Sequence, residues 1–384
     1  MGRLRQEGYD LQFRANHLLV KVPYATDSRS VAYGYLASEL TLSGDCTTTP
    51  GTHVAYFIGS APGDLPCTAD GQVLTELINQ SGPINLGEDL VASCSFSHKP
   101  AQGYPDYYEK MTTYADMLLA HAMVIDPTVT PRTFPPIATD EDESVFRYLD
   151  AASSRARIGA ATDKLRLDKV VIIGLGGTGS YILDLIAKTP VQEIHLYDRD
   201  TFLTHNAFRS PGAATLDELN AAPLKVDYLQ DKYDAMHRRV IAHPEDVTEQ
   251  NVDELRDASF VFVAIDAGPG KRLVLEKLEE FGVPFIDVGM GIYQTGDTLG
   301  GLIRTTASQR GHTENVIEKL SFADQAEDDE YDQNIQIADL NMLNAAMAVI
   351  RWKKLFGFYL DLEREYTSLY TIDGNHLLNE DQGL

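Results

Sequence analysis

Apolar and polar positions alternate over several short stretches in the first third of the chain, as half-buried strands require. Three such stretches, at 17–24, 52–59 and 90–97, are separated by turns rich in glycine, proline and aspartate. Apolar side chains then recur at steps of three or four over 107–125, which predicts an amphipathic helix. Residues 1–137 are therefore predicted to form a small α+β domain.

The pattern changes beyond residue 137. A proline-containing segment ends in the acidic cluster 140–143, and a helix is predicted at about 144–164. Residues 138–164 are therefore predicted to be an acidic linker with a helix that leads into the next domain. Continuous apolar runs at 169–174, 193–198, 259–266 and 283–289 then alternate with helical stretches. Such runs are typical of buried parallel strands in βαβ units. Residues 165–384 are therefore predicted to be an α/β domain with a mainly parallel sheet, ending in a helix at 337–359 and a strand pair at 365–375.

A glycine-rich turn follows the first of these apolar runs and opens a helix. Its glycines are Gly174, Gly176, Gly177 and Gly179, which give G-x-G-x-x-G with one extra glycine. They permit a tight turn and close approach of the backbone to phosphate, which faces the helix N-terminus. Asp198, with Asp200 beside it, ends the next strand, where an acid binds ribose hydroxyl groups. The sequence therefore predicts a nucleotide site.

Polar residues after this motif go beyond what a nicotinamide-dependent oxidoreductase needs. Asn206, Arg209 and Lys225 follow the acids, and a later strand end supplies Asp266 and Lys271. Guanidinium and ammonium groups can bind a triphosphate, and a carboxylate can hold Mg²⁺. An enzyme that attacks the α-phosphate of ATP fits this set better, although an NAD-dependent oxidoreductase stays an alternative.

The combination resembles the ThiF/MoeB adenylyltransferases, a superfamily that includes the ubiquitin-activating enzymes. The resemblance covers about 144–370 and implies a Rossmann-like adenylation domain that uses ATP and Mg²⁺. It implies that Asp198 holds the ribose and that Asp266 binds Mg²⁺. Asn206, Arg209 and Lys225 would contact the phosphates.

The resemblance also implies a reaction and partners. The C-terminal carboxylate of a ubiquitin-like protein would attack the α-phosphate of ATP, giving an acyl-adenylate and pyrophosphate. Relatives are homodimers, in which Arg155 or Arg157 would reach the ATP of the partner subunit, and a conjugating enzyme would act downstream. The first module resembles the N-terminal domain fused to ThiF-like proteins of bacterial ubiquitin-like conjugation operons, where it would bind substrate or partner. Adenylation of a small-molecule carboxylate and a catalytically inactive ThiF-like scaffold are further alternatives.

The cysteines depart from the family pattern. The chain has three, Cys46, Cys67 and Cys94, and none lies beyond residue 94. No C-x-x-C pair is present, so no zinc is expected. Cys94 is expected in the core of the first module, and Cys67, in a loop rich in glycine and proline, is expected to be the most accessible thiol.

The adenylation domain therefore lacks the cysteine that ubiquitin-activating relatives acylate. The region in which it would be expected carries hydroxyl groups instead, on Thr305, Thr306 and Ser308. One hypothesis is that one of them, Ser308 first, accepts the acyl group as an ester. The alternative is that all three are ordinary hydroxyl groups of a solvated loop.

Charge and hydropathy limit the remaining classes of partner. The net charge is −25, which opposes binding to nucleic acid or to an anionic membrane surface. No apolar h-region follows the N-terminal arginines, and no stretch reaches 18 uncharged apolar residues. With so few cysteines, a reducing, cytoplasmic location is expected.

Overall fold

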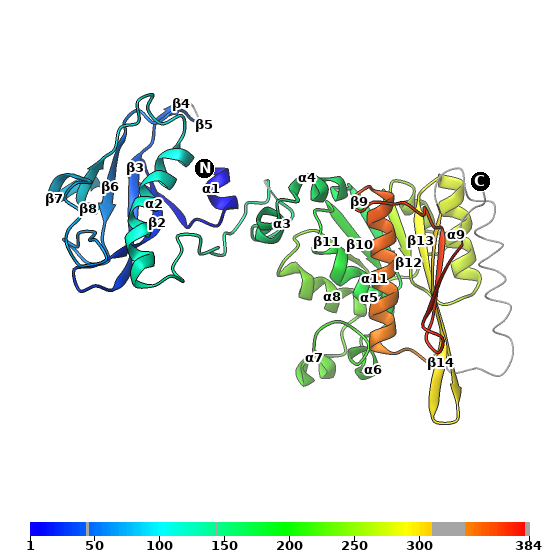
Figure 1. Ribbon diagram of the computed structural model, residues 1–384. Helices are drawn as coiled ribbons and strands as arrows, with labels where there is room; N and C mark the ends of the chain where they lie inside the picture. The colour runs from blue at the N-terminus through cyan, green and yellow to red at the C-terminus, as the bar shows by residue number, and fades with distance from the viewer. Residues whose placement is uncertain (44–45, 143, 309–334, 381–384) are drawn as a thin grey trace. The chain divides into compact units, whose positions relative to one another are not determined.

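The computed structural model describes residues 1–43, 46–142, 144–308 and 335–380, and it divides into two compact units (Figure 1). The N-terminal unit comprises Met1–Ile137 and Asp150–Arg157. The C-terminal unit comprises Ala138–Leu149 and Ile158–Leu384. Each unit has its own hydrophobic core. No helix in the described ranges combines the length and the apolar character needed to cross a membrane.

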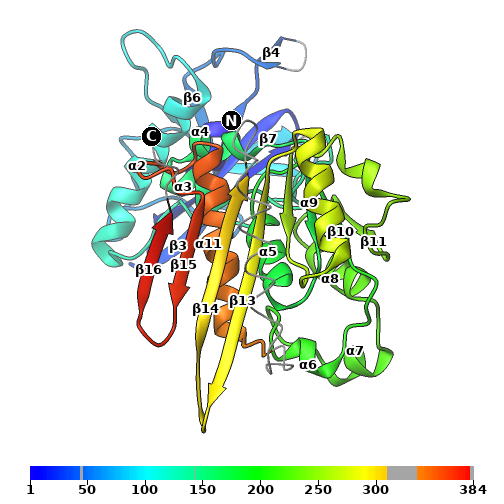
Figure 2. The same ribbon diagram turned by 90° about the vertical axis from the view of Figure 1, so that its right-hand side faces the viewer.

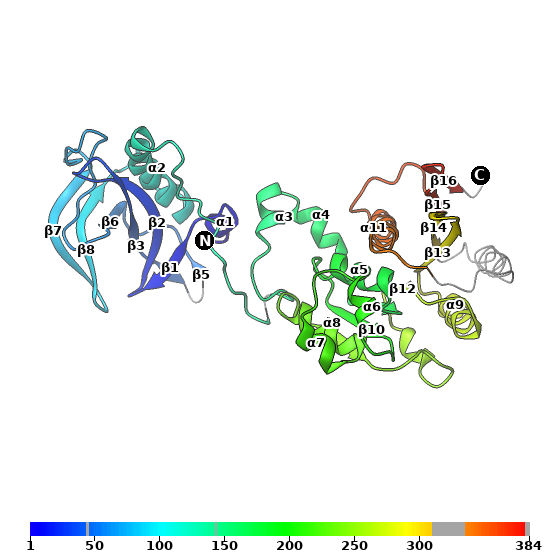
Figure 3. The ribbon, with the colours of Figure 1, turned by 90° about the horizontal axis from the view of Figure 1, so that it is seen from below.

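The N-terminal unit is an antiparallel sheet with a long helix packed against it (Figure 3). In spatial order its strands are β1 (Leu11–Arg14), β2 (His17–Ala25), β3 (Val31–Glu39), β6 (Val54–Ile58), β8 (Leu90–Ser97) and β7 (Ile78–Gly87). Smaller elements are α1 (Gly2–Gln6), β4 (Leu42–Ser43) and β5 (Cys46–Thr47). The predicted strands at 17–24, 52–59 and 90–97 correspond to β2, β6 and β8.

The long helix, α2 (Tyr107–Ile125), begins and ends where the sequence predicts. The side chain of Asp106 caps it by accepting a hydrogen bond from the backbone N–H of Glu109. Its apolar face includes Met111, Tyr114 and Leu118, which pack onto the core of the unit. The helix therefore covers one face of the sheet.

The C-terminal unit is built on an eight-stranded mixed sheet. In spatial order its strands are β11 (Val240–His243), β10 (Glu193–Tyr197), β9 (Lys169–Ile173), β12 (Phe260–Val263), β13 (Phe285–Thr295), β14 (Thr298–Ser308), β15 (Thr367–Thr371) and β16 (His376–Glu380). The first five are parallel, and the remaining pairings are antiparallel. Figure 2 shows the hairpin of β13 and β14 extending beyond the rest of the sheet.

Helices cover both faces of this sheet, which explains the continuous apolar runs. Along β9, Val170 and Ile172 join one core cluster, whereas Val171 and Ile173 join another. The first cluster includes side chains from α5 (Gly177–Ile186), α8 (Lys225–Asp234) and α11 (Ala338–Leu355). The second includes side chains from α9 (Pro269–Phe281) and the 3₁₀ helix η2 (Val252–Leu255). The α/β fold class predicted for this domain is confirmed.

Two local predictions are wrong. The single helix expected at 144–164 is replaced by α3 (Ala151–Ala156), α4 (Gly159–Thr162) and the 3₁₀ helix η1 (Asp163–Leu165). The chain cannot continue from α3 as one helix because Arg157 adopts a left-handed conformation at φ +59°. The loop expected around Thr305 is instead β14, which pairs with β13 along its whole length. The remaining short helices, α6 (Thr204–Ala207) and α7 (Leu216–Ala221), lie between β10 and α8.

Candidate functional site

The glycine turn joins β9 to α5, and its glycines have different surroundings. Gly174 has φ +88°, and a Cβ on it would lie 2.5 Å from the carbonyl oxygen of Ala264. A Cβ on Gly179 would collide with the carbonyl oxygen of Gly174, and one on Gly177 would collide with the side-chain amide of Asn341. These three glycines are therefore required by packing.

Gly176 is different because it faces open space. A Cβ placed there would have no neighbour closer than 3.8 Å, namely Oε1 of Gln336. Gly176 is the N-cap of α5, and no side chain caps this helix end. The first N–H groups of a helix lack partners within the helix, and they favour an anion. The turn thus leaves room for a phosphate at the position that the motif predicts.

Asp198 and Lys225 meet beside this turn. Asp198 is 8% exposed, and its Oδ2 accepts a hydrogen bond of 2.7 Å from the backbone N–H of Leu175. Lys225, at the first turn of α8, places its Nζ 3.3 Å from the same Oδ2 and 2.6 Å from Oδ2 of Asp200. The hydrogen bond from Lys225 is the main cause that lowers the pKa of Asp200. The sugar-binding acid and the phosphate-binding lysine of the prediction are thus neighbours, and in this state they pair with each other.

Asn206 and Arg209 each keep an unpaired donor. Asn206 is 2% exposed; its Oδ1 accepts a hydrogen bond from the backbone N–H of Leu203, but its Nδ2 has no partner among the described residues. The buried Nε of Arg209 likewise has no hydrogen-bond partner in the described chain. Burial lowers the pKa of Arg209, and the nearby carboxylate of Asp266 opposes this change. Two buried donors on one short segment are therefore without a hydrogen-bond partner in the described chain.

Asp266 and Lys271 lie beyond β12, and the structure gives them different surroundings. Asp266 is exposed in the turn after the strand, close enough to Arg209 to influence its charge. Lys271 is 6% exposed, and its Nζ lies 2.9 Å from Oδ1 of the fully buried Asp287. Arg304 neutralises the other oxygen of Asp287 at 2.9 Å. The ammonium group of Lys271 therefore serves as a counter-ion inside the fold, and contact of Lys271 with a nucleotide stays a prediction.

The two upstream arginines belong to the N-terminal unit. Arg155 lies on α3, with its guanidinium 5.3 Å from the centre of the Phe134 ring. Arg157 is the left-handed residue that ends α3. Both side chains are exposed. Contact of either arginine with the ATP of a partner subunit stays a prediction.

The hydroxyl groups proposed as acyl acceptors are buried. Thr305, Thr306 and Ser308 are 2%, 2% and 1% exposed on β14. Thr305 Oγ1 donates to Oδ1 of Asn344 at 3.2 Å, and Thr306 Oγ1 accepts from Thr367 at 3.4 Å. The expectation of a solvated loop is wrong, because antiparallel pairing with β13 draws these residues into the sheet. An incoming acyl group has no access to them in this structure.

The two described thiols are also withdrawn from solvent. Cys94 is fully buried in the N-terminal core, as expected, and burial raises its pKa to about 12. Cys67 is 1% exposed and is therefore buried as well, although its segment is rich in glycine and proline. The expectation that it is the most accessible of the three thiols stays a prediction. Burial is the main cause that raises its pKa, and Asp27 adds to the effect. Neither thiol has the exposed, electropositive surroundings of a reactive cysteine.

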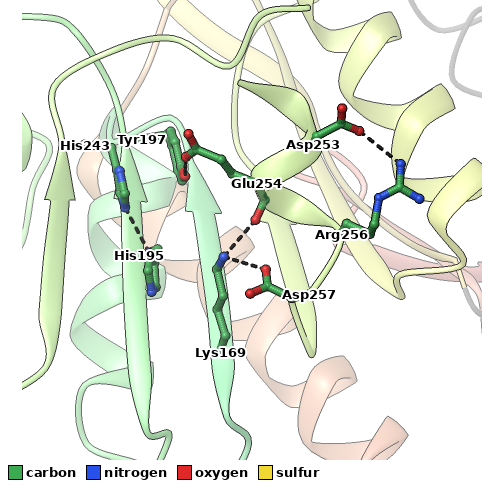
Figure 4. A pocket seen from close by; sticks show the side chains of 8 residues that line it. All are labelled: Lys169, His195, Tyr197, His243, Asp253, Glu254, Arg256 and Asp257. Carbon is green, nitrogen blue, oxygen red and sulfur yellow. Dashed lines mark hydrogen bonds and ion pairs between the residues drawn. The ribbon is translucent and has the colours of Figure 1, made fainter. Parts of the chain in front are cut away.

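A separate cavity of about 430 Å³ opens on the C-terminal unit (Figure 4). It is lined by Lys169, His195, Tyr197, His243, Asp253, Glu254, Arg256 and Asp257, and by none of the predicted nucleotide-binding residues. The rings of Tyr197 and His243 are stacked 4.2 Å apart, and His243 Nε2 lies 2.9 Å from Nδ1 of His195. Burial is the main cause that lowers the pKa of each histidine, so both are neutral at pH 7. The sequence motifs do not predict this cavity, although the alternation of His195 and Tyr197 along β10 places both on one face.

Comparisons with known proteins identify the family. The model of the ThiF family matches residues 152–365, more than half of the chain, and the chain belongs to the ThiF family. This confirms the resemblance to ThiF/MoeB adenylyltransferases. Residues 1–151 match a family described as a domain of unknown function, DUF6791. A search of curated proteins finds no match.

Solved structures similar to this chain include two proteins at low sequence identity. PaaA is 16% identical with a TM-score of 0.48, and the match covers 72% of this chain and 85% of PaaA. A structure of Escherichia coli MccB with ATP is 18% identical with a TM-score of 0.43, and the match covers 58% of this chain and 66% of that chain. A structure of MccB with MccA-N7isoASN has the same identity and coverage and a TM-score of 0.45.

Proposed function

We propose that this chain is an ATP-dependent adenylyltransferase that activates the C-terminal carboxylate of a ubiquitin-like protein. The observation that carries the proposal is the pair of unpaired buried donors, Asn206 Nδ2 and Arg209 Nε, in a ThiF-family domain. An unpaired buried donor is costly and therefore calls for an explanation. The phosphates of ATP would satisfy both donors.

A chain of contacts joins these donors to the glycine turn. Gly174 packs against the backbone of Ala264 and the side chain of Ile265. Asp266 follows directly and acts electrostatically on Arg209. The phosphates of a nucleotide at the turn would therefore lie within reach of the guanidinium group. Positioning and charge neutralisation are what attack on an α-phosphate requires.

Asp198 and Lys225 would change partners when ATP binds. Lys225 would turn its Nζ from the two carboxylates to a phosphate oxygen, and Asp198 would accept hydrogen bonds from the ribose. The backbone N–H of Leu175 would keep Asp198 in place during this exchange. The two residues would thereby bind sugar and phosphate together, as the sequence analysis proposes.

Asp266 suits the Mg²⁺ that such a reaction uses. It is an exposed carboxylate beside the proposed phosphate site, and carboxylate oxygen is a ligand that Mg²⁺ prefers. No group of three metal-binding side chains occurs within the ranges that the structure describes. This fits Mg²⁺, which is commonly held by one or two carboxylates together with substrate phosphates and water. When bound, the ion would neutralise negative charge on the phosphates.

The identity of the substrate and the partners rests on the resemblance to the activating enzymes. We propose that the adenylation domain acts as a homodimer in the cytoplasm, with Arg155 or Arg157 near the partner's nucleotide. The N-terminal module, 1–137, would bind the ubiquitin-like protein or a conjugating enzyme, with 138–164 as the connection to the adenylation domain at 165–384.

Exchange of labelled pyrophosphate into ATP tests the proposal. Small ubiquitin-like proteins encoded by neighbouring genes are offered with Mg²⁺, and the same proteins without their last residue serve as controls. Exchange is expected only with the intact C-terminus, and Arg209→Ala is expected to abolish it. Arg166→Ala is the matched control, because Arg166 is an exposed arginine paired with Asp163.

Other outcomes would support the alternative functions. Exchange that depends on small carboxylates would indicate a small-molecule substrate. Binding of NAD(H) without any exchange would indicate an oxidoreductase. Binding of ATP without exchange for any carboxylate would indicate an inactive scaffold. Each of these results would overturn the proposal.

A further inference from the structure

An exposed serine on the N-terminal unit lies against an imidazole. Ser97 is the last residue of β8, and His53 immediately precedes β6. Antiparallel pairing of β6 with β8 sets Val54 opposite Ser97 and so brings His53 beside it. His53 Nε2 lies 3.1 Å from Ser97 Oγ. This is the distance at which a base can take the proton of a serine nucleophile.

The imidazole is attached to a firmly held backbone. The carbonyl oxygen of His53 accepts a hydrogen bond of 2.6 Å from the hydroxyl group of Tyr114, which is fully buried on α2. The preceding carbonyl, that of Thr52, accepts one of 2.9 Å from the buried Lys110. On the serine side, the backbone N–H of His98 donates to the same Tyr114 hydroxyl at 2.7 Å. Helix α2 therefore fixes both members of the pair relative to each other.

Ser97 differs in access from the other candidate nucleophiles. Cys67 and Cys94 are buried, and so are the hydroxyl groups on β14. Ser97 is exposed at the end of its strand, and its hydroxyl group contacts a base. The adenylation domain lacks the cysteine that ubiquitin-activating relatives acylate, yet an exposed hydroxyl–imidazole pair is present on the N-terminal unit.

We propose that Ser97 Oγ is a covalent acyl acceptor and that His53 is its general base. This rests on the proposed function, since the acyl donor is the acyl-adenylate made by the C-terminal unit. The oxygen of Ser97 attacks the carbonyl carbon, and its proton passes to Nε2 of His53. The bond between the acyl carbon and the phosphate oxygen breaks, and AMP leaves. The product is an ester between the ubiquitin-like protein and Ser97.

The first test follows the ester in the full-length chain. The chain is incubated with Mg²⁺-ATP and the ubiquitin-like protein that supports pyrophosphate exchange, and the adduct is mapped by mass spectrometry. An adduct on Ser97 that hydroxylamine cleaves and thiols leave intact is expected. Ser97→Ala should remove it and retain exchange, whereas Ser28→Ala should change neither. Ser28 is the matched control because it is exposed and its hydroxyl group lies within hydrogen-bond distance of the hydroxyl groups of Thr26 and Ser30.

Two variants separate chemistry from structure. Ser97→Cys should form the adduct as a thioester that thiols cleave, which a purely structural serine would not produce. His53→Gln keeps a polar side chain but removes the base, and it should slow adduct formation by about 100-fold or more. Exchange that continues while the adduct stays absent, or an adduct that persists in Ser97→Ala, overturns the inference and leaves the proposed function intact.

A second test does not depend on adenylation. The chain is treated with p-nitrophenyl acetate, and acetylated peptides are compared between the wild type, Ser97→Ala and His53→Gln. Acetylation of Ser97 that rises with pH and is strongly reduced in His53→Gln supports the pair as a nucleophile and its base. Equal labelling of Ser97 and Ser28, or equal labelling with and without His53, contradicts it. Loss of exchange together with retained, His53-dependent acetylation would instead refute the proposed function.

Discussion

Replacing Arg209 by methionine is predicted to make the empty protein more stable and the nucleotide complex weaker. The guanidinium group carries a buried Nε without a partner among the described residues, and it is attracted to the exposed carboxylate of Asp266. Methionine keeps an unbranched side chain and removes the charge. The unfolding free energy without ATP therefore reports on the unpaired donor, and the affinity for ATP reports on the contact between the guanidinium group and a phosphate.

The magnitudes follow from these contacts. A buried donor without a partner costs about 1–3 kcal/mol, whereas an exposed ion pair contributes less than about 1 kcal/mol. We therefore expect the unfolding free energy of the empty Arg209→Met variant to rise by about 1 kcal/mol. A hydrogen bond to a charged group is worth about 1.5–3 kcal/mol, so the affinity for ATP should fall about 10- to 150-fold.

The single tryptophan allows the change in stability and the change in ATP binding to be measured in the C-terminal unit, which contains Arg209. Trp352 is fully buried in the core of the C-terminal unit, against Phe260 and Phe262. Its fluorescence during denaturation by guanidinium chloride, with and without Mg²⁺-ATP, reports on that unit alone. At ATP 100-fold above the wild-type Kd, the wild type should gain about 2.7 kcal/mol and the variant less than about 1.5 kcal/mol.

Arg166→Met is the control for this experiment. Arg166 is an exposed arginine whose guanidinium group lies 3.2 Å from Asp163, and its removal should change the unfolding free energy by less than about 1 kcal/mol. It should leave the stabilisation by ATP unchanged. The reasoning would be refuted if Arg209→Met destabilised the empty protein and still gained the full stabilisation from ATP.

Three further predictions concern the glycine turn, the two histidines of the cavity and a buried lysine. Gly176→Ala should preserve the unfolding free energy within about 1 kcal/mol, because its Cβ enters open space, and it should weaken ATP binding measured by calorimetry. Gly179→Ala should destabilise the fold, because its Cβ meets a backbone carbonyl oxygen. Acidification from pH 7 to 5 should lower the stability of the C-terminal unit, because His195 and His243 take up protons more readily in the unfolded chain than in the folded chain. A variant with glutamine at both positions should lose less stability over this pH range, as measured by urea denaturation. Burial lowers the pKa of Lys110 to about 8, so the stability of the N-terminal unit should rise between about pH 8 and 10 by up to about 1.4 kcal/mol per pH unit. Hydrogen exchange in α2 measures this rise, which should vanish in Lys110→Met. An unchanged slope in that variant would contradict the assignment.

The sequence predicts those elements whose signals are local. The helix α2 has a capping aspartate, Asp106, and apolar positions at helical spacing, so its ends are predictable. The strand β9 is apolar at successive positions because both of its faces are covered. By contrast, β14 contains glycines and hydroxyl side chains that favour a loop, and only its long pairing with β13 makes it a strand. The left-handed residue Arg157 gives no clear signal in a segment that otherwise favours a helix.

In the candidate site, too, the features with local sequence signals are predictable and those that depend on long-range pairing are not. Asp198 is predictable because the glycine motif fixes where an acid should follow. The partners of Lys271 are not, because its carboxylate, Asp287, belongs to the next strand of the sheet and is completed by Arg304 from an antiparallel neighbour. Such contacts arise from strand order and register, which no spacing in the sequence records.

The shared hydrogen bonding of Asp198 has a consequence for ligand selectivity. A phosphate chain that lacks a sugar would draw Lys225 away and leave the buried carboxylate of Asp198 with the backbone N–H groups of Leu175 and Asp200 but without the ammonium group of Lys225. An unpaired buried charge is penalised, whereas a ribose supplies hydroxyl groups that relieve the penalty. The site would therefore bind free pyrophosphate and tripolyphosphate more weakly than a nucleotide, because these ligands supply no ribose hydroxyl groups to Asp198. In a cell where inorganic phosphates are abundant, this would keep the site open for the nucleotide.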